Sequence, residues 1–333
     1  MSLRLFEARM DLDLRCNYRC RYCLGHGEPS APVEPYSLDY LAKAFATLGE
    51  LCWSVYLSCA GEPLMHPRLP EVIGAANRAF ALTDTSLVTN GSLLNEARIG
   101  VLAASALTHV FVSLDTVDPG LYSHLCGATP KSAARVLLQI QALARACERR
   151  GAPRVGLIAI AMRSTLPHLE ALARFAVDSG IRVVRVHWLI ADRPHPFIDA
   201  ERVDPGSALP VLRRVQRLLA AHGVAFEYPD PDLLNKARAT LARVRATPAP
   251  VGYVLYQAKK LWQRRRLCGC RAAGRPLTVV GDGELLFCSH PAHSVGNVTT
   301  SSVAELRARI AQKIDHLRVQ PFAECRGCGF AAA

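Results

Sequence analysis

The residues best placed to do chemistry are three cysteines, Cys16, Cys20 and Cys23, separated by three and then two residues. One short loop can bring their thiolates to three corners of an iron–sulfur cube. Such cubes usually take four cysteine ligands, so a loop that supplies three leaves one iron open to another molecule. The alternative is half of a zinc site, in which Cys20 and Cys23 form one ligand pair.

Four cysteines near the carboxyl end also have the spacing of a metal site: Cys270, Cys288, Cys325 and Cys328. Between the first two, segments 277–280 and 284–287 flank Gly-Asp-Gly, a sequence typical of a hairpin turn. Such a hairpin would return the chain so that two distant cysteines approach each other. Four thiolates suit zinc as well as iron, and Cys268 is an alternative to Cys270 as the first ligand.

Composition indicates a soluble, cytoplasmic protein. The chain has 333 residues, of which 50% are hydrophobic, enough for a packed core. The first fourteen residues carry three acidic side chains, so we expect no signal peptide, and no apolar run approaches the length of about 18 residues typical of a membrane span. The cysteines outside the two groups are expected to be mainly buried thiols: Cys52, Cys59, Cys126, Cys147 and Cys268.

The net charge of +12 is concentrated in one part of the chain. Residues 201–275 contain fifteen Lys or Arg and five Asp or Glu, which gives this stretch a charge of +10. One interpretation is a solvated helical surface. The other is a surface for an anionic substrate, an acidic peptide or an acidic electron donor. Few aromatic residues accompany the basic ones, which argues against nucleic acid as a partner.

From residue 5 to residue 189 the hydrophobic pattern alternates between strands and helices. It predicts six strands, over 5–14, 53–58, 85–89, 109–115, 154–162 and 183–189. It also predicts five helices, over 38–48, 69–79, 96–104, 130–149 and 166–179. This alternation indicates a parallel sheet with helices outside it, whose chemistry lies at the carboxyl ends of the strands. Residues 191–267 are predicted to form a basic, mostly helical bridge.

The cysteine loop, followed by these strand ends, resembles the signature of the radical S-adenosylmethionine (SAM) enzymes. The resemblance implies an α/β fold, a partial (β/α)6 TIM-type barrel. It also implies that Cys16, Cys20 and Cys23 bind a [4Fe-4S] cluster whose open iron chelates the methionine end of SAM. Tyr22 matches the aromatic residue that lies beside the adenine in this family.

The segment after the second predicted strand, Gly61-Glu62-Pro63, resembles the family's Gly-Gly-Glu-Pro motif. The resemblance implies that Gly61 and Glu62 help to hold the amino group of SAM. Ala60 stands where the family has its first glycine, which puts slightly more bulk near that contact.

The ends of the third and fourth predicted strands also match family positions that contact SAM. Asn90 ends the third strand, and Ser113 and Asp115 end the fourth. Ser113 and Asp115 share one face because side chains alternate along a strand. The resemblance implies that Ser113 contacts the ribose hydroxyls.

The carboxyl-terminal cysteines resemble the ligands of SPASM and twitch modules, which hold auxiliary iron–sulfur clusters in radical SAM enzymes. Four ligands imply one auxiliary [4Fe-4S] cluster that is closed to substrate and suited to electron transfer. The predicted domains are a barrel over 1–190, the bridge over 191–267, and a small cysteine-rich β-hairpin and helix module over 268–333.

The resemblance implies an oxidoreductase. It would receive an electron from a ferredoxin or flavodoxin, cleave SAM to a 5′-deoxyadenosyl radical and remove hydrogen from its substrate. The lead hypothesis is oxidation of a polar small molecule such as a sugar, an aminocyclitol or a nucleotide-linked metabolite. One alternative is modification of a ribosomally made peptide, and a remote one is a zinc-ribbon binding protein. For the group that removes the substrate proton, position alone indicates His187, Asp192 and His290.

Overall fold

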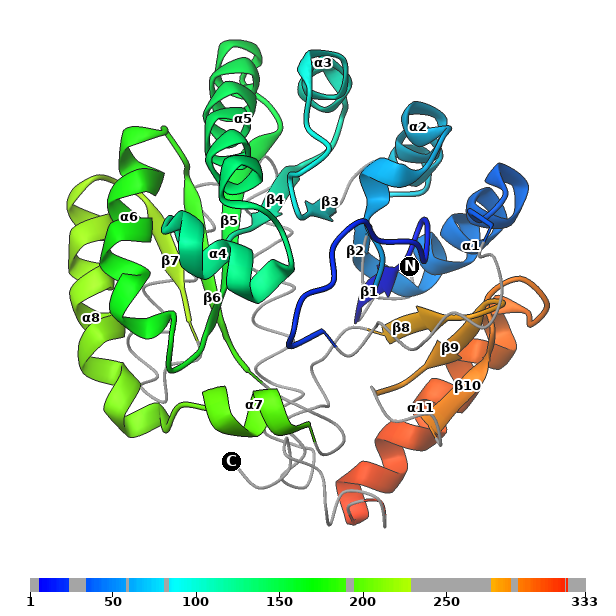
Figure 1. Ribbon diagram of the computed structural model, residues 1–333. Helices are drawn as coiled ribbons and strands as arrows, with labels where there is room; N and C mark the ends of the chain where they lie inside the picture. Colours follow the sequence, from blue (N-terminus) through cyan, green and yellow to red (C-terminus); the bar gives the residue numbers. More distant parts are fainter. Residues whose placement is uncertain are drawn as a thin grey trace.

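One continuous sheet organises the fold. The computed structural model describes residues 6–23, 34–57, 60–80, 84–189, 195–228, 277–288, 293–320 and 322. Within this part of the chain, ten strands form a sheet in the order β10-β9-β8-β1-β2-β3-β4-β5-β6-β7 (Figure 1). The neighbouring pairs from β1 to β7 are all parallel. A parallel sheet flanked by helices is the architecture of a partial TIM barrel, as predicted.

The parallel strands are β1 Phe6–Met10, β2 Cys52–Leu57, β3 Asp84–Thr89, β4 His109–Ser113, β5 Arg154–Ala161, β6 Val183–Trp188 and β7 Ala225–Glu227. The helices of this region are α1 Leu38–Leu51, α2 Leu69–Ala79, α3 Glu96–Ala104, α4 Pro119–Cys126, α5 Pro130–Arg150, α6 Leu169–Asp178, α7 Pro196–Glu201 and α8 Pro205–Ala221, with short 3₁₀ turns η1 Pro63–Met65 and η2 Leu166–His168. The six predicted strands and five predicted helices are confirmed, with the last helix divided into η2 and α6.

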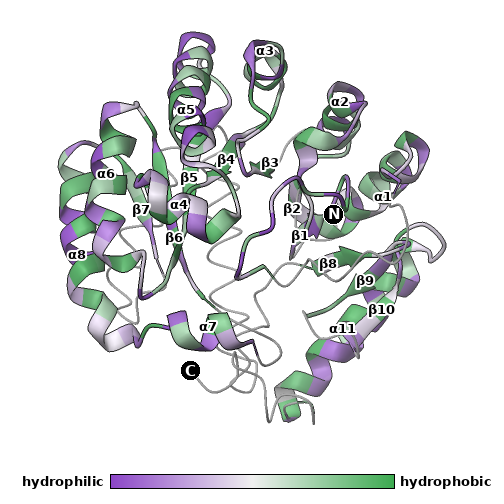
Figure 2. Cartoon of the chain, viewed as in Figure 1, coloured by the Kyte–Doolittle hydropathy of each residue, from purple (hydrophilic) through white to green (hydrophobic). Residues whose placement is uncertain are grey.

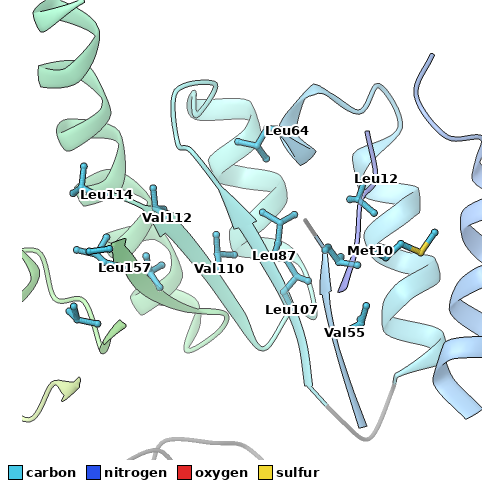
Figure 3. Packing of buried hydrophobic residues seen from close by; sticks show 14 of the residues in the cluster. Met10, Leu12, Val55, Leu64, Leu87, Leu107, Val110, Val112, Leu114 and Leu157 are labelled. Atoms are coloured by element: carbon cyan, nitrogen blue, oxygen red, sulfur yellow. The ribbon is translucent and has the colours of Figure 1, made fainter. Parts of the chain in front are cut away.

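Alternate residues of the strands enter two different cores. On the outer face, Met10, Val55, Leu87, Val110 and Leu157 are at most 1% exposed and pack under the helices (Figure 3). The helices cover these residues because each carries a hydrophobic side and a hydrophilic side (Figure 2). On the inner face, a second cluster surrounds the barrel interior and contains Tyr56, Phe111, Val183 and Ala225.

The carboxyl-terminal part continues the same sheet. Strands β8 Leu277–Val280 and β9 Glu284–Leu286 form the predicted antiparallel hairpin, and β10 Ser294–Asn297 pairs with β9. In the turn, Gly281 and Gly283 have φ of 52° and 108°, a region that favours glycine. Helix α11, Val303–Val319, begins at a capping box in which Ser302 and Glu305 bond each other's backbone N–H.

The sheet crosses both predicted domain boundaries. Strand β7, from the predicted bridge, pairs with β6, and β8, from the predicted cysteine-rich module, pairs in parallel with β1. The boundaries at 190 and 267 stay predictions, because residues 229–276 lie outside the described residues. Among the helices described here, none combines the length and apolar composition that crossing a bilayer requires.

Candidate functional site

The loops that follow β1, β2 and β3 meet at the carboxyl ends of these strands. The backbone N–H of Glu62 donates to the carbonyl oxygen of Arg15 at 2.8 Å. The side chain of Asn90 donates to the side-chain oxygen of Asn17 at 3.1 Å. The fold therefore brings the cysteine loop together with the two motif positions predicted on the neighbouring strands, at the edge where parallel sheets hold ligands.

A buried carboxylate lies just before the cysteine loop in the chain. Asp13 is 1% exposed and accepts three hydrogen bonds from Arg15, from the backbone N–H at 3.0 Å, from Nε at 2.9 Å and from Nη2 at 2.6 Å. A bidentate Arg–carboxylate pair has a fixed geometry. This pair therefore sets the direction in which the chain reaches Cys16.

Helix α4 holds the other side of the cysteine loop. The backbone N–H groups of Arg19 and Arg21 donate to the carbonyl oxygens of Cys126 and Leu125, at 3.3 Å and 2.9 Å. These carbonyls are available because they belong to the last turn of α4, which has no further helical partners for them. The cysteine loop therefore completes the end of this helix.

The three cysteines of the loop are more accessible than the cysteines of the barrel's hydrophobic core. Cys16, Cys20 and Cys23 are half-buried, whereas Cys52, Cys126 and Cys147 are buried, as predicted for thiols that serve as small hydrophobic groups. Three half-buried thiols on one short loop fit a cluster that they ligate on one side only. Within the described residues, no three Cys, His, Asp or Glu side chains surround a single point as ligands of one metal ion.

The surroundings of the cysteine thiols shift their pKa values in different directions. Burial raises the pKa of the Cys16 thiol. A hydrogen bond with the thiol of Cys126 lowers the pKa of Cys20 and, together with burial, raises the pKa of Cys126. Cys126 therefore stays protonated beside Cys20, and Cys20 has the stronger tendency of the two to be a thiolate ligand.

Gly61 lies directly on the chain that leads to the cysteine loop. A Cβ atom at this position would stand 1.7 Å from the carbonyl oxygen of Asp13. The carboxylate of Asp11 accepts the backbone N–H groups of Ala60 and Gly61, at 2.7 Å and 3.1 Å. Only glycine allows this close approach of two backbones. Asp11 was not predicted as a site residue, although its carboxylate follows β1 directly.

The carboxylate of Glu62 is buried and accepts three hydrogen bonds. They come from the hydroxyl of Thr89 at 2.6 Å, from the backbone N–H of Asn90 at 2.7 Å and from that of Leu64 at 3.0 Å. Burial raises the pKa of Glu62 to about 6. A carboxylate has roughly four lone-pair positions, so one remains for the predicted contact with an ammonium group. In the structure, Glu62 joins its loop to the end of β3.

Asn90 touches the cysteine loop from β3. Its side-chain N–H group lies 3.8 Å from the sulfur of Cys16 as well as donating to Asn17. Its oxygen accepts the backbone N–H and the hydroxyl of Ser92, at 2.9 Å and 2.6 Å. The amide is therefore held in one orientation, with its donor face toward the first of the three thiols.

Tyr22 and Asp115 form a direct hydrogen bond in which the phenol donates to the carboxylate. The other oxygen of Asp115 accepts the backbone N–H of Ile160 at 2.8 Å. Asp115 is 5% exposed, and burial raises its pKa to about 6. Asp115 therefore connects the cysteine loop with β4 and β5, while the half-buried Ser113 ends β4 beside it.

The remaining predicted site residues are only partly described. His187 is exposed on β6, in register with Ile160 of β5, and thus at the same edge of the sheet. Cys288 is half-buried and follows β9. Outside the described residues lie Asp192, Cys268, Cys270, His290, Cys325 and Cys328.

The barrel interior contains a charged group that was not predicted. Arg185 of β6 is 5% exposed; its Nε donates to Glu227 of β7 at 2.7 Å and its Nη1 to the hydroxyl of Tyr56 of β2 at 3.1 Å. Its guanidinium carbon also stands 4.2 Å from the centre of the Phe111 ring. The period of two along β6, which puts Arg185 and His187 on one face, is the signal that would have found it.

The part of the chain that contains this site resembles known proteins. Residues 14–176 match the Radical SAM superfamily. GTP 3′,8-cyclase of Microcystis aeruginosa is 31% identical over 131 residues, which cover 37% of this chain and 39% of that relative. The probable GTP 3′,8-cyclase of Methanopyrus kandleri is 38% identical over 121 residues, 36% of this chain and 37% of the relative. The chain thus spans well under half the length of these relatives.

Two solved structures resemble nearly the whole chain. Streptococcus suis SuiB bound to S-adenosylmethionine has a TM-score of 0.69 over 98% of this chain and 71% of that chain, at 15% identity. SuiB has also been crystallised with its precursor peptide SuiA. The protein anSMEcpe with bound AdoMet has a TM-score of 0.63 over 97% of this chain and 86% of that one, at 12% identity. At these identities the likeness shows the fold.

Proposed function

Because residues 14–176 match the Radical SAM superfamily, we propose that this chain is an enzyme that cleaves SAM reductively and removes hydrogen from a polar substrate. The observation that carries the proposal is the loop with Cys16, Cys20 and Cys23, fixed by hydrogen bonds at the edge of the sheet where Glu62, Asn90 and Asp115 also lie.

The residues of this edge have separate tasks in the proposal. Cys16, Cys20 and Cys23 would hold the [4Fe-4S] cluster, while Gly61 and Ser113 belong to the predicted SAM contacts. When bound, the cluster and SAM supply an electron and a radical able to take hydrogen from an unreactive C–H bond. The chain itself supplies orientation, because Asp13, α4, Asn90 and Asp115 each fix one part of the loop.

A polar small molecule is the substrate class that the barrel interior favours. Arg185, Glu227 and Tyr56 place charged and hydroxyl groups on the inner face, and His187 lies two residues further toward the open end of β6. Buried polar groups accept a ligand that returns hydrogen bonds and reject one that leaves them unpaired. The similarity to GTP 3′,8-cyclases agrees with a polar or nucleotide-linked molecule.

The second cluster is a further part of the proposal. Cys270, Cys288, Cys325 and Cys328 would hold one closed [4Fe-4S] cluster, which would accept an electron after the substrate radical loses a proton. The net reaction would then be a two-electron oxidation, with a ferredoxin or flavodoxin as the initial electron donor. The hairpin of β8 and β9, which ends just before Cys288, supports this assignment.

A peptide substrate is the second candidate. It is favoured by the likeness to SuiB, which extends over 98% of this chain and includes a structure with a precursor peptide. A hydrogen-transfer assay, in which deuterated cell extract supplies the substrate, distinguishes a small-molecule substrate from a peptide. A small molecule would pass a 3-kDa filter and survive protease treatment, whereas protease would destroy a peptide.

Anaerobic reconstitution tests the function itself. We expect about eight irons per chain, given two cubanes, and 5′-deoxyadenosine when SAM and a reductant are added. Replacing Cys16, Cys20 and Cys23 together by alanine should remove about four irons and all SAM cleavage. The matched control is Cys147→Ala, a buried cysteine of α5, which should keep both. Zinc in place of iron, or SAM cleavage by the triple variant, would overturn the proposal and favour a zinc-ribbon protein.

A further inference from the structure

Two described segments at the cysteine loop carry basic residues and no acidic ones. Segments 14–23 and 119–147 contain no Asp or Glu. The first contains Arg15, Arg19 and Arg21, and the second contains Lys131, Arg135 and Arg145. The carboxylate of Asp13 compensates Arg15 at 2.6 Å. Arg145 lies far along α5, so the cations that remain next to the loop are Arg19, Arg21, Lys131 and Arg135.

The two segments are neighbours in space. The backbone of Arg19 and Arg21 bonds the last turn of α4, and the hydroxyl of Tyr18 lies 3.4 Å from that of Ser132 in the first turn of α5. Lys131 is therefore beside the cysteine loop, and α5 extends away from it (Figure 1). The amino end of α5 adds the positive end of its dipole to the same surface.

One stripe of α5 has the composition of a docking surface. Lys131, Arg135 and Leu138 follow at i, i+4 and i+7, and so they share one side of the helix. Lys131 and Arg135 are exposed, and Leu138 is 65% exposed; within the described residues only Val319 is a more exposed large hydrophobic side chain. An apolar side chain next to exposed cations is typical of a surface that is covered in a complex.

The acidic residues of the adjoining helices are already engaged. The carboxylate of Asp118 accepts the backbone N–H of Leu121 at the start of α4. On α7, whose Phe197 lies under the guanidinium of Arg21, Asp199 pairs with Arg202 at 3.2 Å and Glu201 accepts from Ser164. Within the described residues, no carboxylate forms an ion pair with Arg19, Lys131 or Arg135.

We propose that an acidic electron-carrier protein docks on the surface formed by Arg19, Arg21, Lys131, Arg135 and Leu138, and delivers its electron through the adjacent cysteine loop. The proposal rests on the proposed function, because it requires an acceptor cluster at this loop. The surface is basic, so its charge is complementary to that of an acidic partner. Electrostatic attraction between the two proteins raises the rate at which they associate. This one-electron transfer requires no further reactant, because the carrier is oxidised as the cluster is reduced.

The test compares two reductants on the reconstituted enzyme. An acidic flavodoxin, kept reduced, is the protein donor, and photoreduced 5-deazariboflavin is a small uncharged donor that needs no docking surface. Lys131→Glu with Arg135→Glu reverses the charge on the proposed surface. The matched control is Arg145→Glu with Arg149→Glu, which changes the net charge equally at the far end of the same helix. Cluster reduction is followed by absorbance, and flavodoxin binding is measured directly.

We expect the Lys131/Arg135 variant to be reduced by flavodoxin at least about tenfold more slowly and to bind it correspondingly more weakly, because reversing charges at an interface acts on association. Its reduction by 5-deazariboflavin should equal that of the wild type. The control variant should match the wild type with both donors. Salt should slow only the reaction with flavodoxin, and Leu138→Ser should weaken flavodoxin binding without changing the thermal transition.

Three results would overturn the proposal. These are an unchanged flavodoxin rate in the Lys131/Arg135 variant, an equal loss in the Arg145/Arg149 control, and an equal loss with 5-deazariboflavin. The last would place the effect in the cluster site itself. A wild-type enzyme that 5-deazariboflavin cannot drive to cleave SAM is a different result, since it contradicts the proposed function and not the docking surface.

Discussion

The phenol of Tyr22 donates a hydrogen bond to the carboxylate of Asp115, which also accepts the backbone N–H of Ile160. This relationship links the residue next to Cys23 with the ends of β4 and β5. Both side chains were predicted as SAM contacts from their positions in the sequence. In the structure they bond to each other, so they also fix the cysteine loop before any ligand arrives.

Tyr22→Phe should loosen the cysteine loop without unfolding the barrel. A hydrogen bond to a charged group contributes about 1.5–3 kcal/mol, so the loop should open at least about tenfold more often. The measurement is the rate at which a chelator removes iron from the reconstituted protein. Tyr228→Phe is the matched control, because that phenol bonds Gln216 at 3.3 Å, away from the site. Equal iron release from the two variants would contradict the role of the Tyr22 hydroxyl.

Asp115 should make the protein less stable as pH rises from 5 to 7. Burial raises its pKa from 3.8 to about 6, so the folded protein binds a proton that the unfolded chain has already released. The stability from this proton is complete below the unfolded pKa and is lost as pH rises through about 6, a change of about 1 kcal/mol. Urea unfolding at several pH values should show a smaller change for Asp115→Asn. Asp178→Asn, an exposed carboxylate at the end of α6, should leave the wild-type change intact.

Gly61→Ala should disrupt the site, because its Cβ would stand 1.7 Å from a backbone oxygen that cannot rotate away. We expect a loss of stability of about 1–3 kcal/mol from overpacking and a loss of SAM binding as the loop is displaced. Gly100→Ala in α3 is the control, since nothing lies within 4 Å of its Cβ, and alanine should stabilise that helix by up to about 1 kcal/mol. Thermal unfolding and SAM binding measure both. A Gly61→Ala protein with wild-type SAM affinity would be inconsistent with the described packing.

Arg185→Met should lower the free energy of unfolding more than removal of both members of the ion pair. It leaves the Glu227 carboxylate in the barrel interior without its closest cation, at a cost of about 3 kcal/mol. The double variant Arg185→Met with Glu227→Met removes both charges and should recover most of that loss. Chemical unfolding gives the free energies. If the double variant is no more stable than the single one, the pair is not the reason for the loss.

Local sequence signals were sufficient for most of the barrel, and they were also present for α4, which was not predicted, and for α11, which was predicted without bounds. Buried runs of β-branched and aromatic residues, such as Val110 to Val112, specify their strands directly. Helix α4 also had readable signals, since Asp118 caps it, Pro119 occupies its first turn and Gly127 ends it at a φ of 68°. The capping box of α11, Ser302 and Glu305, was equally present in the sequence.

Relationships between distant residues could not be predicted in the same way. Tyr22 lies 93 positions from Asp115, and Arg185 lies 129 positions from Tyr56. No periodicity connects such pairs, because they depend on which strands become neighbours and on the curvature of the sheet. The positions of Glu62 and Asn90 were found through the family motif, but the mutual hydrogen bond that gives them a structural role was visible only in the folded chain.

The pairing of β1 with β8 affects how this protein can be made. Strand β1 ends at Met10 and its partner β8 begins only at Leu277, so β1 leaves the ribosome long before that partner is made. At typical synthesis rates the open edge of β1 therefore waits on the order of ten seconds or more, a period in which an uncovered strand can pair with foreign chains. Protection of the nascent barrel by chaperones, and not the final folding step alone, should therefore limit the yield of active protein.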